Sequence, residues 1–140
     1  WTCRRREFYM NIAVIGTGGV GGYFGAKLAS LAESGSGLHV SFIARGMHLR
    51  VIQKNGLLVD SDEGKIVCMP SLATDDMGAL PQPDLCLVCV KGYDLSAALV
   101  HLAPVVSEKT VIIPLMNGVD IYERIRTGHC VFWKYNRAGP

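Results

Sequence analysis

Six residues near the start of the chain have the types and spacing of a phosphate-binding turn. They are Gly16-Thr17-Gly18-Gly19-Val20-Gly21, and they fit the pattern G-x-G-x-x-G. In that pattern the first glycine permits a tight turn after a strand, the second lets a pyrophosphate approach the backbone, and the third lets a helix pack closely. The phosphates then bind the free N–H groups at the positive end of the helix. The motif predicts a dinucleotide site to which all six residues belong.

A basic residue follows the second apolar run of the chain. That run spans residues 38–44, the next residue is Arg45, and residues 38–53 contain no acid. Folds that prefer NAD usually place Asp or Glu there to bind the ribose hydroxyls, whereas an arginine binds the 2′-phosphate of NADP through charge-assisted hydrogen bonds. The sequence therefore favours NADP(H) as the cofactor and Arg45 as the residue that binds its 2′-phosphate. The alternative is that Arg45 is a solvated loop cation.

Two further polar residues follow later apolar runs. Lys91 follows residues 84–90, and Asn117 comes soon after residues 110–115. Open α/β sheets bind their ligands at the carboxyl ends of the strands, so both side chains are candidates for contacts with the cofactor or a substrate. Position alone leaves each of them equally consistent with a turn residue.

Neither the histidines nor the cysteines have the spacing of a metal site. No histidine has a partner at H-x-x-x-H spacing, and the five cysteines are scattered along the chain. Cys86 and Cys89 match C-x-x-C, but they lie in an apolar run that we interpret as a strand, where residues three apart point to opposite faces. We therefore predict no metal and expect buried free thiols. His48, close after Arg45, either assists at the adenosine phosphate or is a solvated residue at the start of a helix.

The elements that would position these residues alternate between apolar runs and helical periodicity, which predicts βαβ units. A polar stretch between two short apolar runs predicts an inserted hairpin. The expected strands are residues 11–15, 38–44, 84–90 and 110–115, the expected helices are 19–34, 47–54, about 95–102 and one starting near 121, and the hairpin strands are 57–59 and 65–69. The pattern predicts an α/β fold of Rossmann type, with a doubly wound parallel sheet.

Two of the helices carry apolar residues at helical spacing. In each case the spacing predicts the face that packs against the sheet. The first stripe is Val20, Phe24, Leu28 and Leu31, and the second is Leu95, Ala98, Leu99 and Leu102. Gly22 and Gly25 are expected to serve helix packing only.

Composition and charge limit the classes of protein to which this chain can belong. The chain has 140 residues, of which 49% are apolar, and a net charge of +2. This charge is too small to indicate nucleic acid or an anionic membrane as a partner, and no run approaches the ~20 apolar residues of a membrane span. We expect a cytoplasmic protein in three parts: a non-native or disordered leader at 1–9, a nucleotide-binding domain at 10–126, and an irregular tail at 127–140 that reflects truncation or a frame-shift.

Five short segments together carry a resemblance to a known family. They are Ile15-Gly16-Thr17-Gly18-Gly19-Val20-Gly21-Gly22, Ala44-Arg45-Gly46, Asn55-Gly56-Leu57, Val88-Cys89-Val90-Lys91 and Met116-Asn117-Gly118-Val119. In order and spacing they resemble the N-terminal domain of the ketopantoate reductase family, over roughly residues 10–126.

The resemblance implies an activity and roles for the matching residues. The activity is NADPH-dependent reduction of 2-dehydropantoate (ketopantoate) to pantoate, on the route to pantothenate and coenzyme A. By resemblance, Gly16, Gly18 and Gly21 cradle the pyrophosphate, Lys91 helps to hold the cofactor and line the cleft, and Asn117 lies by the nicotinamide and the substrate.

The family also carries a helical C-terminal domain that supplies the general acid, and this chain has no counterpart of it. We therefore expect cofactor binding without turnover, and self-association through the exposed interdomain surface. Two alternatives remain open: an NADPH-dependent reductase of another 2-oxo acid, and a non-catalytic NADP(H)-binding module.

Overall fold

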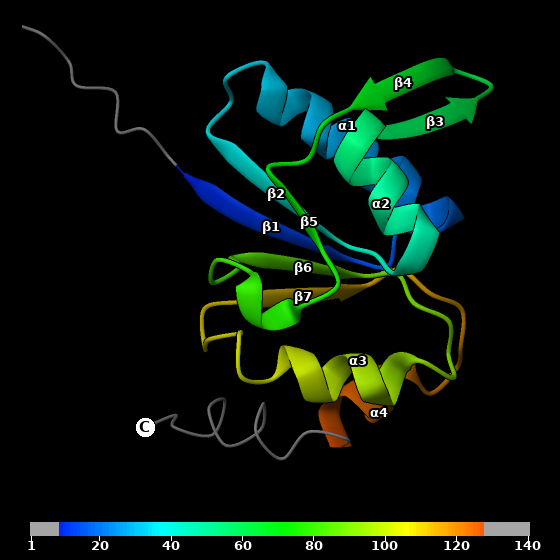
Figure 1. Ribbon diagram of the computed structural model, residues 1–140. Helices are drawn as coiled ribbons and strands as arrows, with labels where there is room; N and C mark the ends of the chain where they lie inside the picture. The colour runs from blue at the N-terminus through cyan, green and yellow to red at the C-terminus, as the bar shows by residue number, and fades with distance from the viewer. Residues whose placement is uncertain (1–8, 128–140) are drawn as a thin grey trace, which may run out of the picture.

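Five parallel strands form the central sheet, in the order β5-β2-β1-β6-β7 (Figure 1). The structure is a computed structural model that describes residues 9–127. The strands are β1 (Met10–Ile15), β2 (Leu38–Ile43), β5 (Leu72–Thr74), β6 (Leu85–Val88) and β7 (Val111–Pro114). The chain moves outward from β1 to β2 and β5, then returns to β6 on the other side of β1. The order therefore reverses between β1 and β6, as the predicted doubly wound fold requires.

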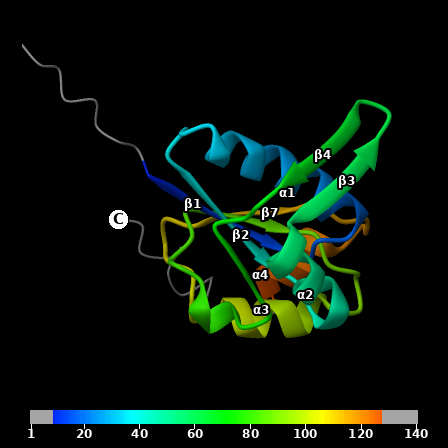
Figure 2. The same ribbon diagram turned by 45° about the horizontal axis from the view of Figure 1, so that its top comes forward.

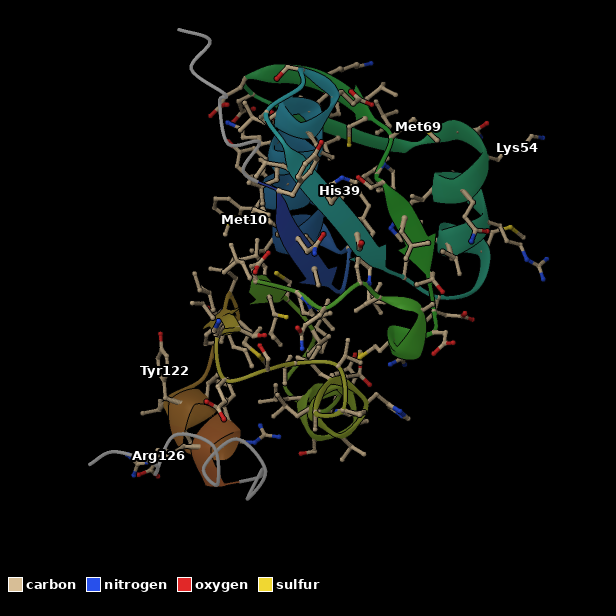
Figure 3. The ribbon with its side chains drawn as sticks, turned by 90° about the vertical axis from the view of Figure 1, so that its left-hand side faces the viewer. Met10, His39, Lys54, Met69, Tyr122 and Arg126 are labelled. Carbon is tan, nitrogen blue, oxygen red and sulfur yellow. The ribbon has the colours of Figure 1, made fainter. Side chains whose placement is uncertain are left out.

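Helices cover both faces of this sheet. They are α1 (Gly19–Glu33), α2 (Gly46–Asn55), α3 (Leu95–Leu102) and α4 (Ile121–Thr127), with a short 3₁₀ helix η1 (Met77–Ala79). One core joins α1 and α2 to the sheet, and a second core joins η1, α3 and α4 to its other face. In Figure 3 these two groups of side chains lie on either side of the sheet, while Lys54 of α2 and Tyr122 of α4 project away from it.

Alternation along the strands explains why one sheet serves two cores. Ile12 and Val14 of β1 belong to the core under α1, whereas Ala13 and Ile15 belong to the core under α3. Successive side chains of a strand point to opposite faces, so an uninterrupted apolar run is what a doubly covered strand needs. The predicted parallel sheet is confirmed.

The apolar stripe predicted for α1 is mostly wrong as its packing face, because only Leu28 of its four residues packs against the core. The expected packing role of Gly22 and Gly25 is confirmed. Val20, Phe24 and Leu31 are exposed by 51%, 45% and 54%. The buried residues of the helix are instead its smallest: Gly21, Gly22, Gly25, Ala26 and Ala29. A Cβ on Gly25 would lie 2.9 Å from the ring of Phe42, so the helix approaches β2 more closely than a larger residue there would allow. The stripe predicted for α3 is confirmed, since Leu95, Ala98, Leu99 and Leu102 are all buried.

The predicted hairpin is confirmed and lies beside α1 (Figure 2). It consists of β3 (Leu57–Ser61) and β4 (Gly64–Cys68) in antiparallel pairing. Glu63 in its turn accepts hydrogen bonds from Tyr23 Oη and Lys27 Nζ of α1. These charge-assisted contacts lower the pKa of Glu63 and raise that of Lys27. The hairpin is thereby attached to the helix that opens the glycine motif.

Two short elements were not predicted, and two predicted segments remain untested. β5 and η1 each span three residues, too few to show a period. Of the expected leader at 1–9 only Tyr9 is described, with its ring centroid 5.8 Å from that of His39. The expected tail at 127–140 lies outside the described residues, apart from Thr127 at the end of α4. Among residues 9–127, no helix is long and apolar enough to cross a membrane.

Candidate functional site

A hollow of about 380 Å³ opens at the carboxyl ends of the central strands. It lies at the point where the strand order reverses, between β1 and β6. Residues from three predicted site positions meet there: the glycine turn after β1, Arg45 after β2 and Lys91 after β6. His48, from the first turn of α2, also lines the hollow. Parallel strands bring their carboxyl ends to one edge of a sheet, so residues far apart in sequence form one site.

The glycine turn has the shape that its motif predicts. Gly16 has φ +92°, a value that residues with a side chain rarely adopt. Its N–H donates to the carbonyl of Ile43 at 3.1 Å. A Cβ on Gly21 would lie 1.9 Å from the carbonyl oxygen of Gly16. A Cβ on Gly18, by contrast, would have no atom within 4 Å. Gly16 and Gly21 therefore make the turn possible, and Gly18 leaves open space beside the backbone.

Thr17 lines this hollow and carries a buried polar atom that the described residues leave unsatisfied. The residue is only 7% exposed, yet its Oγ1 has no hydrogen-bond partner within the described part of the chain. A buried hydroxyl without a partner carries a desolvation cost, so such atoms are rare outside sites that bind something. The carbonyl of the same residue is held by His48 Nε2 at 3.1 Å. Thr17 thus combines a carbonyl that is bonded to α2 with a buried hydroxyl that has no partner among residues 9–127, in a residue that lines the hollow.

Two helices begin at the hollow without a capping side chain. Gly18 is the N-cap of α1 and Arg45 is the N-cap of α2; neither side chain caps its helix, and neither first turn contains an acid. The first N–H groups of a helix have no partner within it, and the helix dipole makes this end positive. The beginnings of α1 and α2 are therefore both suited to bind phosphate groups.

The charged side chains around the hollow are mainly basic. Arg45 and Lys91 line it, and Asp94 is the acid among its lining residues. Asp94 is the N-cap of α3, and its N–H donates to the carbonyl of Lys91 at 2.9 Å. Two basic side chains and one acid give a positive balance, which favours a ligand with several phosphates.

The predicted site residues do not all reach the hollow. Gly16, Thr17, Gly18, Arg45 and Lys91 line it. Gly19, Val20 and Gly21 do not: the first two are exposed at the start of α1, and the third is buried under the turn. Asn117 is exposed in the loop after β7, at the same edge of the sheet but outside the residues that line the hollow. Its contact with a substrate therefore stays a prediction.

The predicted free thiols are confirmed for the described cysteines. Cys68, Cys86 and Cys89 form no disulfide; the first two are buried and the third is half-buried. Cys89 lines the hollow, and burial raises the pKa of its thiol to about 11. A thiol with that pKa is neutral near pH 7, which does not suit a nucleophile. Cys89 instead contributes shape, because a Cβ on Gly21 would lie only 2.8 Å from the Cβ of Cys89.

Several lining residues were not among the predicted site residues, including Met77, Asp94 and His48. Met77 comes from η1, which is too short to leave a periodic signal. Asp94 could have been found, since it directly precedes the apolar stripe of α3, where an N-cap is expected. For His48 the sequence allowed either a contact with the adenosine phosphate or a solvated residue at the start of a helix. The side chain is exposed, as the second interpretation requires, and it also bonds to the glycine turn.

These features fit a dinucleotide. The pyrophosphate needs open backbone, free N–H groups and a hydroxyl donor, which Gly18, the start of α1 and Thr17 provide. A phosphate on the adenosine ribose needs a cation beyond β2, which Arg45 provides. Within residues 9–127, no three His, Cys, Asp or Glu side chains gather in a way that could hold a metal ion.

Comparison with known proteins identifies one sequence family. The sequence model of the family described as ketopantoate reductase PanE/ApbA matches residues 12–130. A 2-dehydropantoate 2-reductase of Mesorhizobium japonicum is 33% identical over 112 residues, which are 79% of this chain and 32% of that protein. The crystal structure of 2-dehydropantoate 2-reductase from Porphyromonas gingivalis W83 superposes with a TM-score of 0.80 at 41% identity, covering 86% of this chain and 42% of that one.

A third relative has a different activity. The ternary structure of D-mandelate dehydrogenase with NADH and anilino(oxo)acetate superposes with a TM-score of 0.65 at 26% identity, over 83% of this chain and 37% of that one. The chain therefore spans about a third of the length of the curated relative given above, and about two fifths of each of the two solved structures.

Proposed function

Because this chain belongs to the ketopantoate reductase family of oxidoreductases, we propose that it forms the NADP(H)-binding part of an NADPH-dependent 2-dehydropantoate 2-reductase. The observation that carries the proposal is the meeting of Arg45, the glycine turn and the unpartnered Thr17 hydroxyl in one hollow at the switch point of the sheet. A cytoplasmic location and a role in pantothenate and coenzyme A biosynthesis belong to the same proposal and rest on the family alone.

In this proposal each residue has a task that follows from its position. Thr17 Oγ1 and the first N–H groups of α1 donate to the pyrophosphate, and Arg45 binds the 2′-phosphate at the start of α2. When bound, NADPH supplies the reducing equivalents for the keto group. Lys91 supplies positive charge to the wall of the hollow, where it can hold the cofactor or a substrate carboxylate. Asn117 would contact the substrate side from the loop after β7.

The test is calorimetric titration of the 140-residue chain with NADPH and with NADH. We expect tighter binding of NADPH by at least about tenfold, since one charge-assisted contact to the 2′-phosphate contributes about 1.5 kcal/mol or more. Equal affinities would contradict the assignment to NADP(H). We also expect no reduction of 2-dehydropantoate by this chain alone, as measured by the absorbance of NADPH; turnover at an ordinary enzymatic rate would contradict that part of the proposal.

A second candidate is reduction of another 2-oxo acid. The observation in its favour is the similarity to D-mandelate dehydrogenase, which was solved with an oxo acid derivative and NADH. The lack of an acid after β2 favours NADP(H) here, so the cofactor titration also bears on this alternative. Substrate preference would be compared by measuring turnover of 2-dehydropantoate and phenylglyoxylate by the longest available form of the protein.

We further propose that the chain self-associates through an open apolar face. We use this name for the exposed apolar residues that α1 and the edge strand β7 present on the same side of the sheet, all exposed by 40% or more: Val20, Phe24, Leu31, Val111 and Ile113. Ile112 packs in the core under α3, so its neighbours Val111 and Ile113 point to the α1 side of the sheet. β7 is also an edge strand, and exposed apolar edges promote association.

Gel filtration tests this association. We expect the unaltered chain to elute as a species larger than a monomer, and Val111→Lys to shift the elution toward the monomer. Val67→Lys is the matched control, because Val67 is 62% exposed but lies on the hairpin, outside the open apolar face. A monomer at all concentrations, or the same shift with Val67→Lys, would refute the proposal.

A further inference from the structure

One side chain of α2 is bonded to the glycine turn that follows β1. His48 Nε2 lies 3.1 Å from the carbonyl oxygen of Thr17, 31 residues earlier in the chain. A carbonyl oxygen can only accept, so Nε2 must carry the hydrogen and donate. This contact joins two separate βα connections at the rim of the hollow, which both residues line.

The two ends of this contact belong to different parts of the nucleotide site. Thr17 lies in the turn that faces the pyrophosphate, and its hydroxyl is buried and unpartnered. His48 lies three residues after Arg45, in the same first turn of α2. The imidazole therefore connects the pyrophosphate turn to the helix that carries the 2′-phosphate arginine.

The turn needs such a restraint because of its composition. Four of its six residues are glycine, which has more conformational freedom than any other residue. Its start is fixed by the bond from Gly16 N–H to Ile43, and its end by the first bond of α1, from Gly22 N–H to the carbonyl of Gly18. Between these points, His48 holds the carbonyl of Thr17 and so limits the orientation of the peptide plane that precedes Gly18.

We propose that His48 is a positioning residue of the nucleotide site. Resting on the proposed function, this inference states that its hydrogen bond to Thr17 preorganises the pyrophosphate turn, and that it does not bind the 2′-phosphate. The ordering of the turn is then complete before the nucleotide arrives, which lowers the entropic cost of binding. The effect is directed at the pyrophosphate, a group that NADPH and NADH share.

This gives His48 a signature that differs from that of Arg45. Loss of the imidazole should weaken the binding of NADPH and of NADH by the same factor. Loss of a residue that binds the 2′-phosphate, in contrast, weakens the binding of NADPH alone. We expect His48→Ala to lower the affinity for both nucleotides roughly three- to tenfold, which is the range of one net hydrogen bond. The ratio of the two affinities should stay unchanged. His48→Gln retains an N–H donor on a side chain of similar reach and should restore most of the affinity.

The experiment is calorimetric titration of the full chain and its variants with NADPH and NADH, with thermal unfolding followed by circular dichroism. Gln53→Ala is the matched control, since Gln53 also donates from α2 to a distant carbonyl, that of Ala73 at 2.8 Å, but it does not line the hollow. We expect this control to leave both affinities unchanged. A similar loss in Gln53→Ala would overturn the inference, because it would show a general effect of loosening α2.

Two further outcomes would also overturn it. One is a loss confined to NADPH in His48→Ala, which would make the imidazole a contact of the 2′-phosphate. The other is unchanged binding of both nucleotides by His48→Ala while the unaltered chain prefers NADPH, which rejects the inference and leaves the proposed function standing. If the unaltered chain bound neither nucleotide, the proposed function would fail, and the inference with it.

Discussion

Arg45→Ala is expected to weaken NADPH binding about 10- to 100-fold and to leave NADH binding unchanged. Removal of a hydrogen bond to a charged group costs about 1.5–3 kcal/mol, and each 1.4 kcal/mol is tenfold in affinity. Arg45 is exposed, so solvent screening places the expected loss toward the lower end of that range. The difference between the two nucleotides is a phosphate on the adenosine ribose, which is why the effect is confined to NADPH.

Calorimetric titration of Arg45→Ala beside Arg50→Ala measures this effect. Arg50 lies on the same helix and is exposed, but it does not line the hollow. Loss of the same positive charge at position 50 therefore controls for the general attraction of a basic surface for a polyanion. An equal loss in both variants would show that net charge, and not a contact by Arg45, sets the preference. An equal loss for NADPH and NADH in Arg45→Ala would place the arginine at a group that both nucleotides share.

Gly21→Ala is expected to cause the largest loss of stability of any substitution in the glycine turn. The added Cβ would lie 1.9 Å from the carbonyl oxygen of Gly16 and 2.8 Å from the Cβ of Cys89. The nearest of these atoms belongs to the backbone of a turn that is bonded to β2, so it cannot move away as the end of a flexible side chain would. We expect a loss of about 2–4 kcal/mol in the free energy of unfolding, measured by urea denaturation.

Gly18→Ala separates stability from binding in the same turn. Its Cβ would have no atom within 4 Å, and the residue has φ −71°, which alanine adopts readily. The change in the free energy of unfolding should therefore stay below about 1 kcal/mol. Binding of NADPH and NADH should nevertheless fall, because the methyl group occupies the space that the pyrophosphate needs. A Gly18→Ala variant with unchanged affinity would contradict the position assigned to the pyrophosphate, and a stable Gly21→Ala variant would contradict the geometry of the turn.

The sequence by itself determined the class of fold and identified five of the residues that line the hollow. The glycine motif, Arg45 and Lys91 were found because the chemistry of a turn and the end of a strand are local properties, readable over a few residues. Uninterrupted apolar runs identified the strands of the doubly covered sheet for the same reason. Once those strands are parallel, their carboxyl ends must share an edge, so the meeting of the three positions followed from topology alone.

The tertiary structure decided between two candidate packing faces of α1, the apolar stripe and the glycine face. The apolar stripe favoured Val20, Phe24 and Leu31, but the helix packs on its glycines and alanines. Periodicity measures how apolar a face is, whereas packing also depends on how closely two backbones can approach. Here the approach is set by the ring of Phe42 and the carbonyl of Gly16. Both groups lie outside α1, so the apolar periodicity of the helix carries no information about them.

The tertiary structure also decided the contacts between the βα connections. The bond from His48 to Thr17 spans 31 residues, and no spacing rule relates the two positions. The same holds for Asn117, whose predicted place beside the ligand depends on the path of the loop after β7 and not on the strand that precedes it. Local patterns determine elements and turns, while the relative placement of side chains on different loops depends on how those loops pack against each other.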